Sequence, residues 1–270
     1  MELKATRYAV EERIATITLA RPHRLNAWTG RMHTEYRWCL EQAEENSEVR
    51  VIIVTGEGRG FCAGADSQAL EGHIEKGGYD SGIREAVANP GYGVRPEFDT
   101  NFAFHFGLTK PVIAAINGPA AGVGLVLACF ADIRFAAAGA KLTTAHGRLG
   151  LPAEFGLSWL LPRLIGLSRA QELLVSSRVF LTEEAAEIGL IHQVLPPEEL
   201  IPAVRAYAAN LASRVAPSSM RVTRHQVYTD LHRDIGSSVA ESEQLLNQLM
   251  RGHDYREGVK ALLEKRDPDF

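Results

Sequence analysis

Two segments rich in small residues could present backbone N–H groups to a negatively charged oxygen. The first covers residues 59–66 (RGFCAGAD) and the second residues 117–124 (NGPAAGVG). Each follows an apolar run typical of a buried strand, and the second runs into an apolar segment typical of a helix. Small residues let a ligand approach the backbone, and the first N–H groups of a helix have no partner inside it. Two such turns could converge on one oxygen and form an oxyanion hole.

Either turn on its own has a plainer interpretation, because small residues also permit tight packing of a strand against a helix. A dinucleotide site is another alternative for the second turn. Gly122 and Gly124 have the spacing of the first two glycines of a GxGxxG motif, but Leu127 stands where that motif has its third. The turn also lies far from the start of the chain, so a dinucleotide site is disfavoured.

One carboxylate lies in apolar surroundings. Glu154 is part of the segment GLPAEFG at residues 150–156. Desolvation there would favour the protonated form and move the basicity of the carboxylate toward neutral pH. A group tuned in this way can take up and return a proton. The alternative is that Glu154 only caps a helix that begins near Gly156.

Two other side chains could have a chemical role. His146 is a second candidate for acid–base chemistry, although a histidine in a loop is more often structural. Cys62 lies in the first turn, but no base stands beside it in the sequence. A nucleophilic role for Cys62 is therefore not expected.

Composition and charge argue against several classes of protein. The 270 residues have a formal net charge of −4, whereas nucleic-acid binding needs clustered Lys and Arg. The three cysteines form no CxxC pattern, so we expect no metal site, and a reducing cytoplasm fits best. The first residues lack the apolar run of a signal peptide. The most apolar stretch, residues 111–131, is interrupted by Asn117 and Pro119, so no membrane span is expected.

These residues need a scaffold, and the hydrophobic pattern predicts one. Residues 13–19 alternate with period two, as in a half-buried strand. Thr29 could cap a helix whose apolar residues recur at helical spacing. The apolar residues of this helix are Met32, Tyr36 and Leu40. Further strands are predicted at residues 49–54, 111–116 and 132–136, and a helix at residues 125–130.

The later parts of the chain have different patterns. Residues 72–107 are rich in glycine and predict a loop-like segment near the active site. The second half is mainly helical: Ser168 could start a capping box, Thr182 could start a short helix ending at Gly189, and helical patterns run onward from about residue 198. Strands alternating with helices, followed by helices, predict an α/β core with a helical C-terminal region.

Together the motifs are more specific than any one of them. The sequence resembles the crotonase (enoyl-CoA hydratase/isomerase) superfamily over nearly its whole length. The matching segments are residues 21–27 (RPHRLNA), 60–66 (GFCAGAD), 110–118 (KPVIAAING), 131–134 (ADIR), 160–166 (LLPRLIG) and 183–194. The resemblance implies an α/β fold, a spiral of ββα units. Residues 1–200 would form its core, and residues 201–270 a helical region that builds homotrimers or dimers of trimers and closes the active site.

The resemblance also implies which residues bind the substrate, a coenzyme A thioester. The N–H groups of Ala65 and Val123 would form the oxyanion hole, with valine where many relatives have glycine. Asp66 is also expected to shape its turn by hydrogen bonds, and Arg24 and Lys265 could instead be ordinary solvated charges. The residues expected to contact the CoA part are His23, Arg24, Leu25, Ala27, Ala63 and Asp66, with Leu262 and Lys265 contributed by a neighbouring subunit.

One departure from the family pattern reduces the number of reactions that this chain is expected to catalyse. Hydratases of the superfamily use two glutamates, and the matching positions here are Val126 and His146. Valine cannot transfer a proton. Glu154, in contrast, matches the acidic residue that several double-bond isomerases of the superfamily use. One carboxylate is enough for that reaction, because it can remove a proton from the α-carbon and return it to the γ-carbon.

We therefore expect an enoyl-CoA isomerase without a tightly bound cofactor, in which coenzyme A enters as part of the substrate. A hydratase that uses Glu154 with an unusual partner stays open, as does another acyl-CoA lyase or hydrolase on the same fold. A non-catalytic acyl-CoA-binding protein is the alternative from a different class. Valine at position 126 favours that alternative, and Glu154 argues against it.

Overall fold

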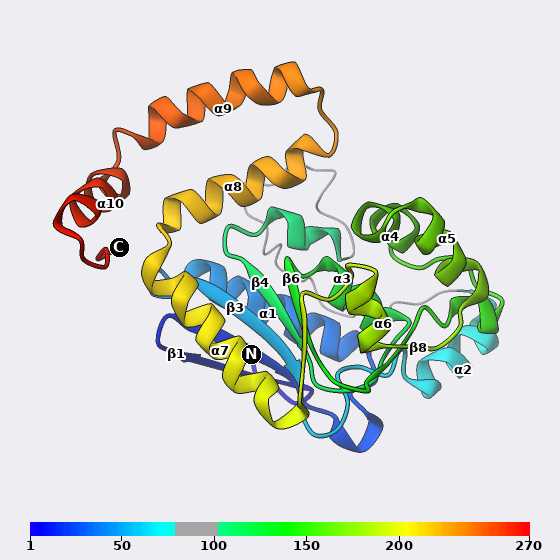
Figure 1. Cartoon of the computed structure of the whole chain (residues 1–270). Helices are drawn as coiled ribbons and strands as arrows, with labels where there is room; N and C mark the ends of the chain where they lie inside the picture. Colours follow the sequence, from blue (N-terminus) through cyan, green and yellow to red (C-terminus); the bar gives the residue numbers. More distant parts are fainter. Residues whose placement is uncertain (79–101) are drawn as a thin grey trace.

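A six-stranded sheet forms the centre of the molecule (Figure 1). The computed structural model describes residues 1–78 and 102–270. The strands, in the order in which they lie side by side, are β1 (Thr6–Glu11), β2 (Ile14–Leu19), β3 (Val51–Gly56), β4 (Val112–Ile116), β6 (Ile133–Ala137) and β9 (Gln193–Leu195). β1 is antiparallel to β2, and the other neighbours are parallel. The carboxyl ends of β2, β3 and β4 therefore meet at one edge of the sheet.

Helices cover both faces of this sheet, because its central strands are apolar at successive positions. In β3, the neighbours Ile52 and Ile53 belong to different core clusters, one on each face. Helices α1 (Gly30–Glu45) and α3 (Val123–Phe130) contribute to the first cluster. Helix α7 (Pro197–Arg214) covers the other face. Its buried residues have helical spacing and are Leu200, Val204, Ala208 and Ala212.

A smaller sheet with the order β5-β7-β8 lies beside the main one. Helix α2 is on the same side of the molecule as β8, α4 and α5 (Figure 1). This side carries the carboxyl ends of β3 and β4. The bounds are β5 Ala120–Ala121, β7 Lys141–Thr143, β8 Phe180–Leu181, α2 Ser67–Lys76, α4 Leu157–Ile165, α5 Leu167–Ser176 and α6 Thr182–Glu187.

The last three helices extend away from the sheet. Helix α8 (Pro217–Asp230) is followed by α9 (Ile235–Leu249), which has no buried residue, and by α10 (His253–Glu264), in which only Ala261 is buried. α9 is the element farthest from the sheet, and α10 lies across the molecule from α2 (Figure 1). The predicted boundary at residue 200 falls inside α7, so the part that leaves the core begins after this helix.

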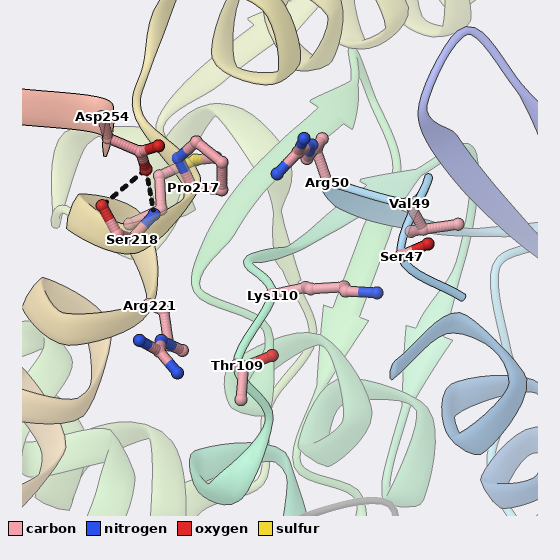
Figure 2. Close-up of a pocket in the computed structure, with 10 residues that line it drawn as sticks. Ser47, Val49, Arg50, Thr109, Lys110, Pro217, Ser218, Arg221 and Asp254 are labelled. Atoms are coloured by element: carbon pink, nitrogen blue, oxygen red, sulfur yellow. Dashed lines mark hydrogen bonds between the residues drawn. The ribbon is translucent and has the colours of Figure 1, made fainter. Parts of the chain in front are cut away.

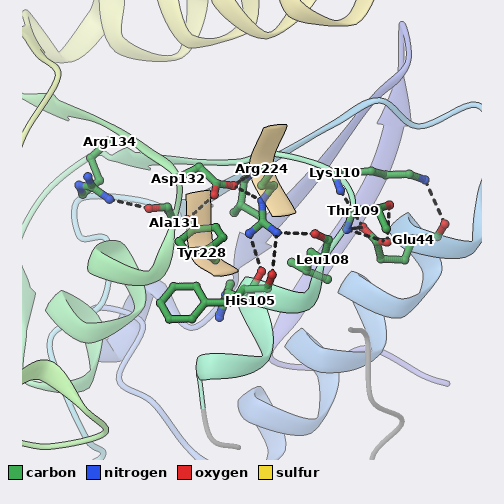
Figure 3. Close-up of polar contacts among 12 residues, drawn as sticks. Glu44, His105, Leu108, Thr109, Lys110, Ala131, Asp132, Arg134, Arg224 and Tyr228 are labelled. Carbon is green, nitrogen blue, oxygen red and sulfur yellow. Dashed lines mark hydrogen bonds and ion pairs between the residues drawn. The ribbon is translucent and has the colours of Figure 1, made fainter. Parts of the chain in front are cut away.

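A buried arginine anchors α8 to the core (Figure 3). Arg224 is 7% exposed, and its Nε donates to Oδ2 of Asp132 at 2.9 Å. Its Nη groups donate to three carbonyl oxygens in the 3-10 helix η3 (Ala103–Gly107) and the residue that follows it. The hydroxyl of Tyr228 donates to the other oxygen of Asp132. The charge of Arg224 is thus fully surrounded by acceptors, as a buried charge requires.

Most of the predicted elements are confirmed. Thr29 caps α1, because its Oγ1 accepts a hydrogen bond from the N–H of Met32 at 3.1 Å. The short helix α6 begins at Thr182, and Gly189 follows it with a φ of 83°. The predicted strands and the helix after the second turn correspond to β2, β3, β4, β6 and α3, with shifts of one or two residues at their ends. No described helix is both long and apolar enough to cross a membrane.

Two predictions about elements need correction. The capping box at Ser168 is wrong, because α5 already begins at Leu167 and its N-cap, Gly166, makes no side-chain hydrogen bond. The segment 72–107 is not a loop throughout, because it starts inside α2 and ends in η3. The part of that prediction that concerns residues 79–101 lies outside the described residues.

Candidate active site

The two turns that contain small residues touch each other beyond the carboxyl ends of β3 and β4. Cys62 forms a parallel bridge with Ala120, and its carbonyl oxygen accepts from the N–H of Ala121 at 3.0 Å. A Cβ atom on Gly124 would lie 2.0 Å from the same oxygen. Glycine is therefore needed where the backbone of α3 meets the first turn.

Each turn leaves one backbone N–H without a protein acceptor. Ala65 forms a parallel bridge with Trp28, in which the N–H of Trp28 donates to Gly64 at 2.7 Å and that of Asp66 donates to Trp28 at 3.0 Å. In this pattern the N–H of Ala65 points away from Trp28. Val123 is the first residue of α3, so its N–H has no acceptor within the helix. Among the described residues, neither N–H donates a hydrogen bond.

Ala65, Val123 and Glu154 line one cavity of about 570 Å³. Most of the other described lining residues are apolar and come from the start of α1, from α2 and from the segment 151–155. Glu154 is the one ionisable side chain among the described residues that line the cavity. All three residues were predicted from the sequence, and the fold brings them together although they are far apart in the chain.

The carboxylate of Glu154 lies against the start of α3. A Cβ atom on Gly122 would lie 3.5 Å from its Oε2, so the carboxylate is next to the residue that precedes Val123. Burial raises the pKa of the Glu154 carboxyl above its ordinary value, and the nearby His146 opposes part of this rise. Glu154 does not cap α4, because the N-cap is Gly156 and no side-chain hydrogen bond is formed there.

His146 does not line the cavity. It is the first residue of the 3-10 helix η4 (His146–Leu149) and is 6% exposed. Its Nδ1 is buried and has no hydrogen-bond partner among the described residues. His146 is near enough to lower the pKa of the Glu154 carboxyl, although it is not among the described residues that line the cavity.

Two other kinds of chemistry, a cysteine nucleophile and a bound metal ion, were compared with the described part of the chain. Burial raises the pKa of the Cys62 thiol to about 12, so this cysteine stays protonated at neutral pH. No group of three His, Cys, Asp or Glu residues among those described could hold a metal ion.

The segment predicted to bind the CoA part is fixed to the first turn. Leu25 and Asn26 have φ values of 49° and 57°, and the buried amide of Asn26 donates to the carbonyl oxygens of Glu57 and Gly60 at 3.0 and 2.7 Å. The N–H of Ala63 donates to Leu25 at 3.0 Å. These bonds compensate for the left-handed conformation of two non-glycine residues.

Asp66 is held by protein groups. Its Oδ2 lies 2.8 Å from an Nη of Arg21, and its Oδ1 accepts from the N–H of Gln68 at 3.1 Å. Burial alone would raise the pKa of the Asp66 carboxyl, but these bonds hold it below its ordinary value. These hydrogen bonds agree with the expectation that Asp66 stabilises the conformation of the first turn. His23 and Arg24, in contrast, are exposed at the surface of η1 (Pro22–Arg24).

Leu262 and Lys265 do not reach this site in their own chain. Leu262 is 77% exposed near the end of α10, and Lys265 is the C-cap of the same helix. Figure 1 places α10 across the molecule from α2, which lines the cavity. The expectation that a neighbouring subunit contributes these two residues stays a prediction.

The aromatic wall of the cavity was not predicted from the sequence. Trp28 and Phe155 both line it. Phe102 packs between them, with ring centroids 5.5 Å from Trp28 and 5.2 Å from Phe155. The only signal in the sequence was position, because Trp28 follows Ala27 and Phe155 follows Glu154. Contacts between residues so far apart in the chain leave no local pattern.

Comparison with known proteins decides the family. The family described as enoyl-CoA hydratase/isomerase matches residues 9–270. The chain belongs to the enoyl-CoA hydratase/isomerase family. It is 36% identical to the 1,2-epoxyphenylacetyl-CoA isomerase of Escherichia coli, with 97% of this chain and 96% of the relative covered. It is 34% identical to a probable enoyl-CoA hydratase of Rhodobacter capsulatus, with 100% and 99% covered.

Solved structures of this family have the same fold. A probable enoyl-CoA hydratase/isomerase from Mycobacterium abscessus superimposes with a TM-score of 0.85 at 29% identity, covering 98% of both chains. An enoyl-CoA hydratase from Bacillus anthracis gives a TM-score of 0.85 at 28% identity, covering 99% of both chains. The predicted crotonase fold is therefore confirmed, and membership of the family extends over the core and the C-terminal helices alike.

Proposed function

We propose that this member of the enoyl-CoA hydratase/isomerase family moves a double bond within an enoyl-CoA thioester, with Glu154 as the single acid–base group. The observation that carries the proposal is the cavity that contains one ionisable side chain and two unpaired N–H groups among its described residues. A thioester oxygen bound by the N–H groups of Ala65 and Val123 would place the neighbouring carbon atoms inside this cavity. Coenzyme A enters as part of the substrate in this proposal.

The reaction needs one base and one stabilised anion. The Glu154 carboxylate removes a proton from the α-carbon of a 3-enoyl-CoA, and the electron pair moves onto the thioester oxygen. The two N–H groups stabilise the resulting dienolate, an effect that is typically worth about 3–4 kcal/mol for each donor. The carboxyl group then returns the proton to the γ-carbon, which gives the 2-enoyl-CoA. A raised pKa makes Glu154 a better base than an exposed carboxylate at the same pH.

A hydratase is the second candidate, and the names of several relatives favour it. Addition of water needs an activated water and a proton donor. Val126 is buried and apolar, so position 126 provides neither. Glu154 would then require a second group, and His146 is the nearby ionisable side chain that influences it.

Initial rates with two substrates test the proposal. We expect the purified protein to convert a 3-enoyl-CoA into the conjugated 2-enoyl-CoA. The conversion can be monitored by the rise in absorbance of the conjugated thioester. We expect little hydration of a 2-enoyl-CoA. Fast hydration without isomerisation would favour the hydratase, and binding without either reaction would favour an acyl-CoA-binding protein.

The variant Glu154→Gln tests the assigned role. It keeps the shape of the side chain but removes the base, so turnover should fall by at least about 10²-fold while substrate affinity stays similar. Val126→Ala is the control, because it changes the position where hydratases have a glutamate and should leave turnover of the folded enzyme largely intact. Normal turnover in Glu154→Gln would refute the role of Glu154.

A further inference from the structure

Figure 2 shows a second cavity, of about 340 Å³. Its lining residues place it at the opposite edge of the sheet from the catalytic cavity. It is found where β3 and β4 begin, between these strands and the N-terminal ends of α8 and α10. The catalytic cavity lies beyond the other ends of the same strands. The described residues that line the two cavities do not overlap.

Three cationic side chains from separate elements line this second cavity. They are Arg50 just before β3, Lys110 just before β4 and Arg221 on α8. In the described part of the chain, neither Arg50 nor Arg221 forms an ion pair, and the Nε of Arg50 is buried without a hydrogen-bond acceptor. Figure 2 shows the guanidinium of Arg50 pointing toward the start of α8.

Lys110 is better satisfied than the two arginines. Its Nζ donates to the carbonyl oxygen of Asn46 at 2.7 Å and to other carbonyl oxygens at the end of α1. Burial lowers the pKa of the Lys110 ammonium, Glu44 opposes this effect, and the positive charge of Arg50 adds to it. Arg50 and Lys110 therefore repel each other as like charges.

The two carboxylates nearby are already occupied. Asp254, which lines the cavity, accepts from the N–H and the hydroxyl of Ser218 at 3.1 and 2.6 Å. Glu44 accepts from the N–H groups of Thr109 and Lys110, each at 3.1 Å. Neither carboxylate pairs with an arginine of the cavity, so an excess of positive charge remains there.

We infer that this cavity is a binding site for a phosphate-type oxyanion. Guanidinium groups bind such anions through paired N–H donors, and an anion at Arg50 would supply the acceptor that its buried Nε lacks. Arg221 of α8 lines the same cavity, so its positive charge would also attract the anion bound at Arg50 of the core. The site would therefore connect the C-terminal helices to the core, and this inference does not depend on the reaction at Glu154.

Thermal unfolding with inorganic phosphate at constant ionic strength tests the site. About a ten-fold excess over the dissociation constant should raise the Tm of the wild-type protein by roughly 3–6 °C. Arg50→Gln should abolish this shift. The exposed Arg221→Gln should reduce it and provides a second variant if Arg50→Gln folds poorly. Arg251→Gln is the matched control, because Arg251 is exposed and outside the cavity, and it should respond like the wild type.

Two further measurements distinguish anion binding in this cavity from anion binding at the CoA site, and a third identifies the kind of anion. The shift should persist when the protein is saturated with coenzyme A, because the CoA site lies at the other edge of the sheet. Hydrogen exchange in α8 and α10 should slow when phosphate is added. Glycerol phosphate binding more tightly than inorganic phosphate would identify a phosphorylated metabolite, and weaker binding would identify the free anion.

An equal shift in Arg50→Gln and wild type would overturn the inference, as would no shift in either. A change in subunit number on Arg50→Gln, without any effect of phosphate, would also overturn it. That result would show that Arg50 takes part in a contact between copies of the chain.

Discussion

At the scale of single residues, two opposing influences set the basicity of Glu154. Burial in the apolar cavity raises the pKa of its carboxyl, and His146 lowers it. The apolar segment around Glu154 was visible in the sequence, which is why the direction of the burial effect could be predicted. The influence of His146 could not be predicted, because it depends on how the folded chain places η4 relative to residues 150–156.

The pH dependence of kcat/KM measures this balance. Because the pKa of Glu154 is raised, the acid limb of the profile should lie above the ordinary range of a glutamate, with activity lost as the pH falls through it. His146→Gln removes the side chain whose interaction lowers the pKa of Glu154, so the limb should move to still higher pH. A limb that does not move would show that His146 has no influence on Glu154.

The raised pKa of Glu154 also affects the stability of the folded protein. Stability should fall as the pH rises, whereas activity should increase. A carboxyl whose pKa is raised by folding stabilises the folded state while both states are protonated, and this contribution declines as the pH rises through the folded-state pKa. Glu154→Gln resembles the protonated form at every pH. Its unfolding free energy should therefore depend less on pH around that pKa than that of the wild type.

At the scale of elements, the oxyanion hole depends on how closely α3 packs against the first turn. Ala at position 124 would bring a Cβ within 2.0 Å of the Cys62 carbonyl oxygen, so one backbone must move. The N–H groups of Ala65 and Val123 would then no longer face the same oxygen. We expect Gly124→Ala to lower kcat by about 10²–10³-fold, the usual effect of losing one donor.

Gly72→Ala is the control for this packing argument. Gly72 lies within α2, and a Cβ atom there would have no neighbour within 4 Å. Alanine at this position should keep activity and stabilise the protein by up to about 1 kcal/mol. Equal kcat values for the two variants and the wild type would show that the contact at Gly124 does not position the oxyanion hole.

The attachment of α8 to the core depends on Arg224. Arg224→Met leaves Asp132 without its cationic partner and removes the donor from three carbonyl oxygens. Breaking a buried pair of this kind costs about 3–5 kcal/mol. Urea unfolding should show this loss, whereas Arg214→Met, which breaks an exposed pair with Asp267, should cost less than about 1 kcal/mol. Similar losses in both variants would contradict the anchoring role.

The elements also show what the sequence could and could not predict. Strands such as β3 and β4 were predicted because continuous apolar runs between turns are local signals. The capping box at Ser168 failed because Gly166, with a φ of 82°, lets α5 start before Ser168. The antiparallel strand β1 was missed, since its residues are mostly exposed and lack a strong pattern. Trp28 and Phe155 were not predicted as neighbours because Phe102 links them only in the folded chain.

At the scale of the whole molecule, the C-terminal region has an apolar helix face that the rest of the chain leaves exposed. Ile235, Val239, Leu246 and Met250 recur on one face of α9, with exposed fractions of 80%, 48%, 56% and 48%. Exposed apolar side chains gathered on one face of a helix are typical of an interface. The sequence pattern predicted this helical region. Its role in a homotrimer or dimer of trimers was implied by the resemblance to the family, and it stays a prediction.

Charge placed on this face of α9 tests both self-association and the origin of the CoA contacts. Val239→Glu combined with Leu246→Glu should prevent assembly, because burying two carboxylates in an apolar interface is costly. Gln244→Glu combined with Gln248→Glu adds the same charge on the opposite face of α9 and should leave assembly intact. Sedimentation velocity at micromolar concentration distinguishes the two. If Leu262 and Lys265 act in a neighbouring subunit, the dissociated variant should also show a raised KM for the CoA thioester while Glu154 and the oxyanion hole are unchanged. A wild-type protein that sediments as a monomer, or a dissociated variant with an unaltered KM, would mean that each chain completes its own CoA site.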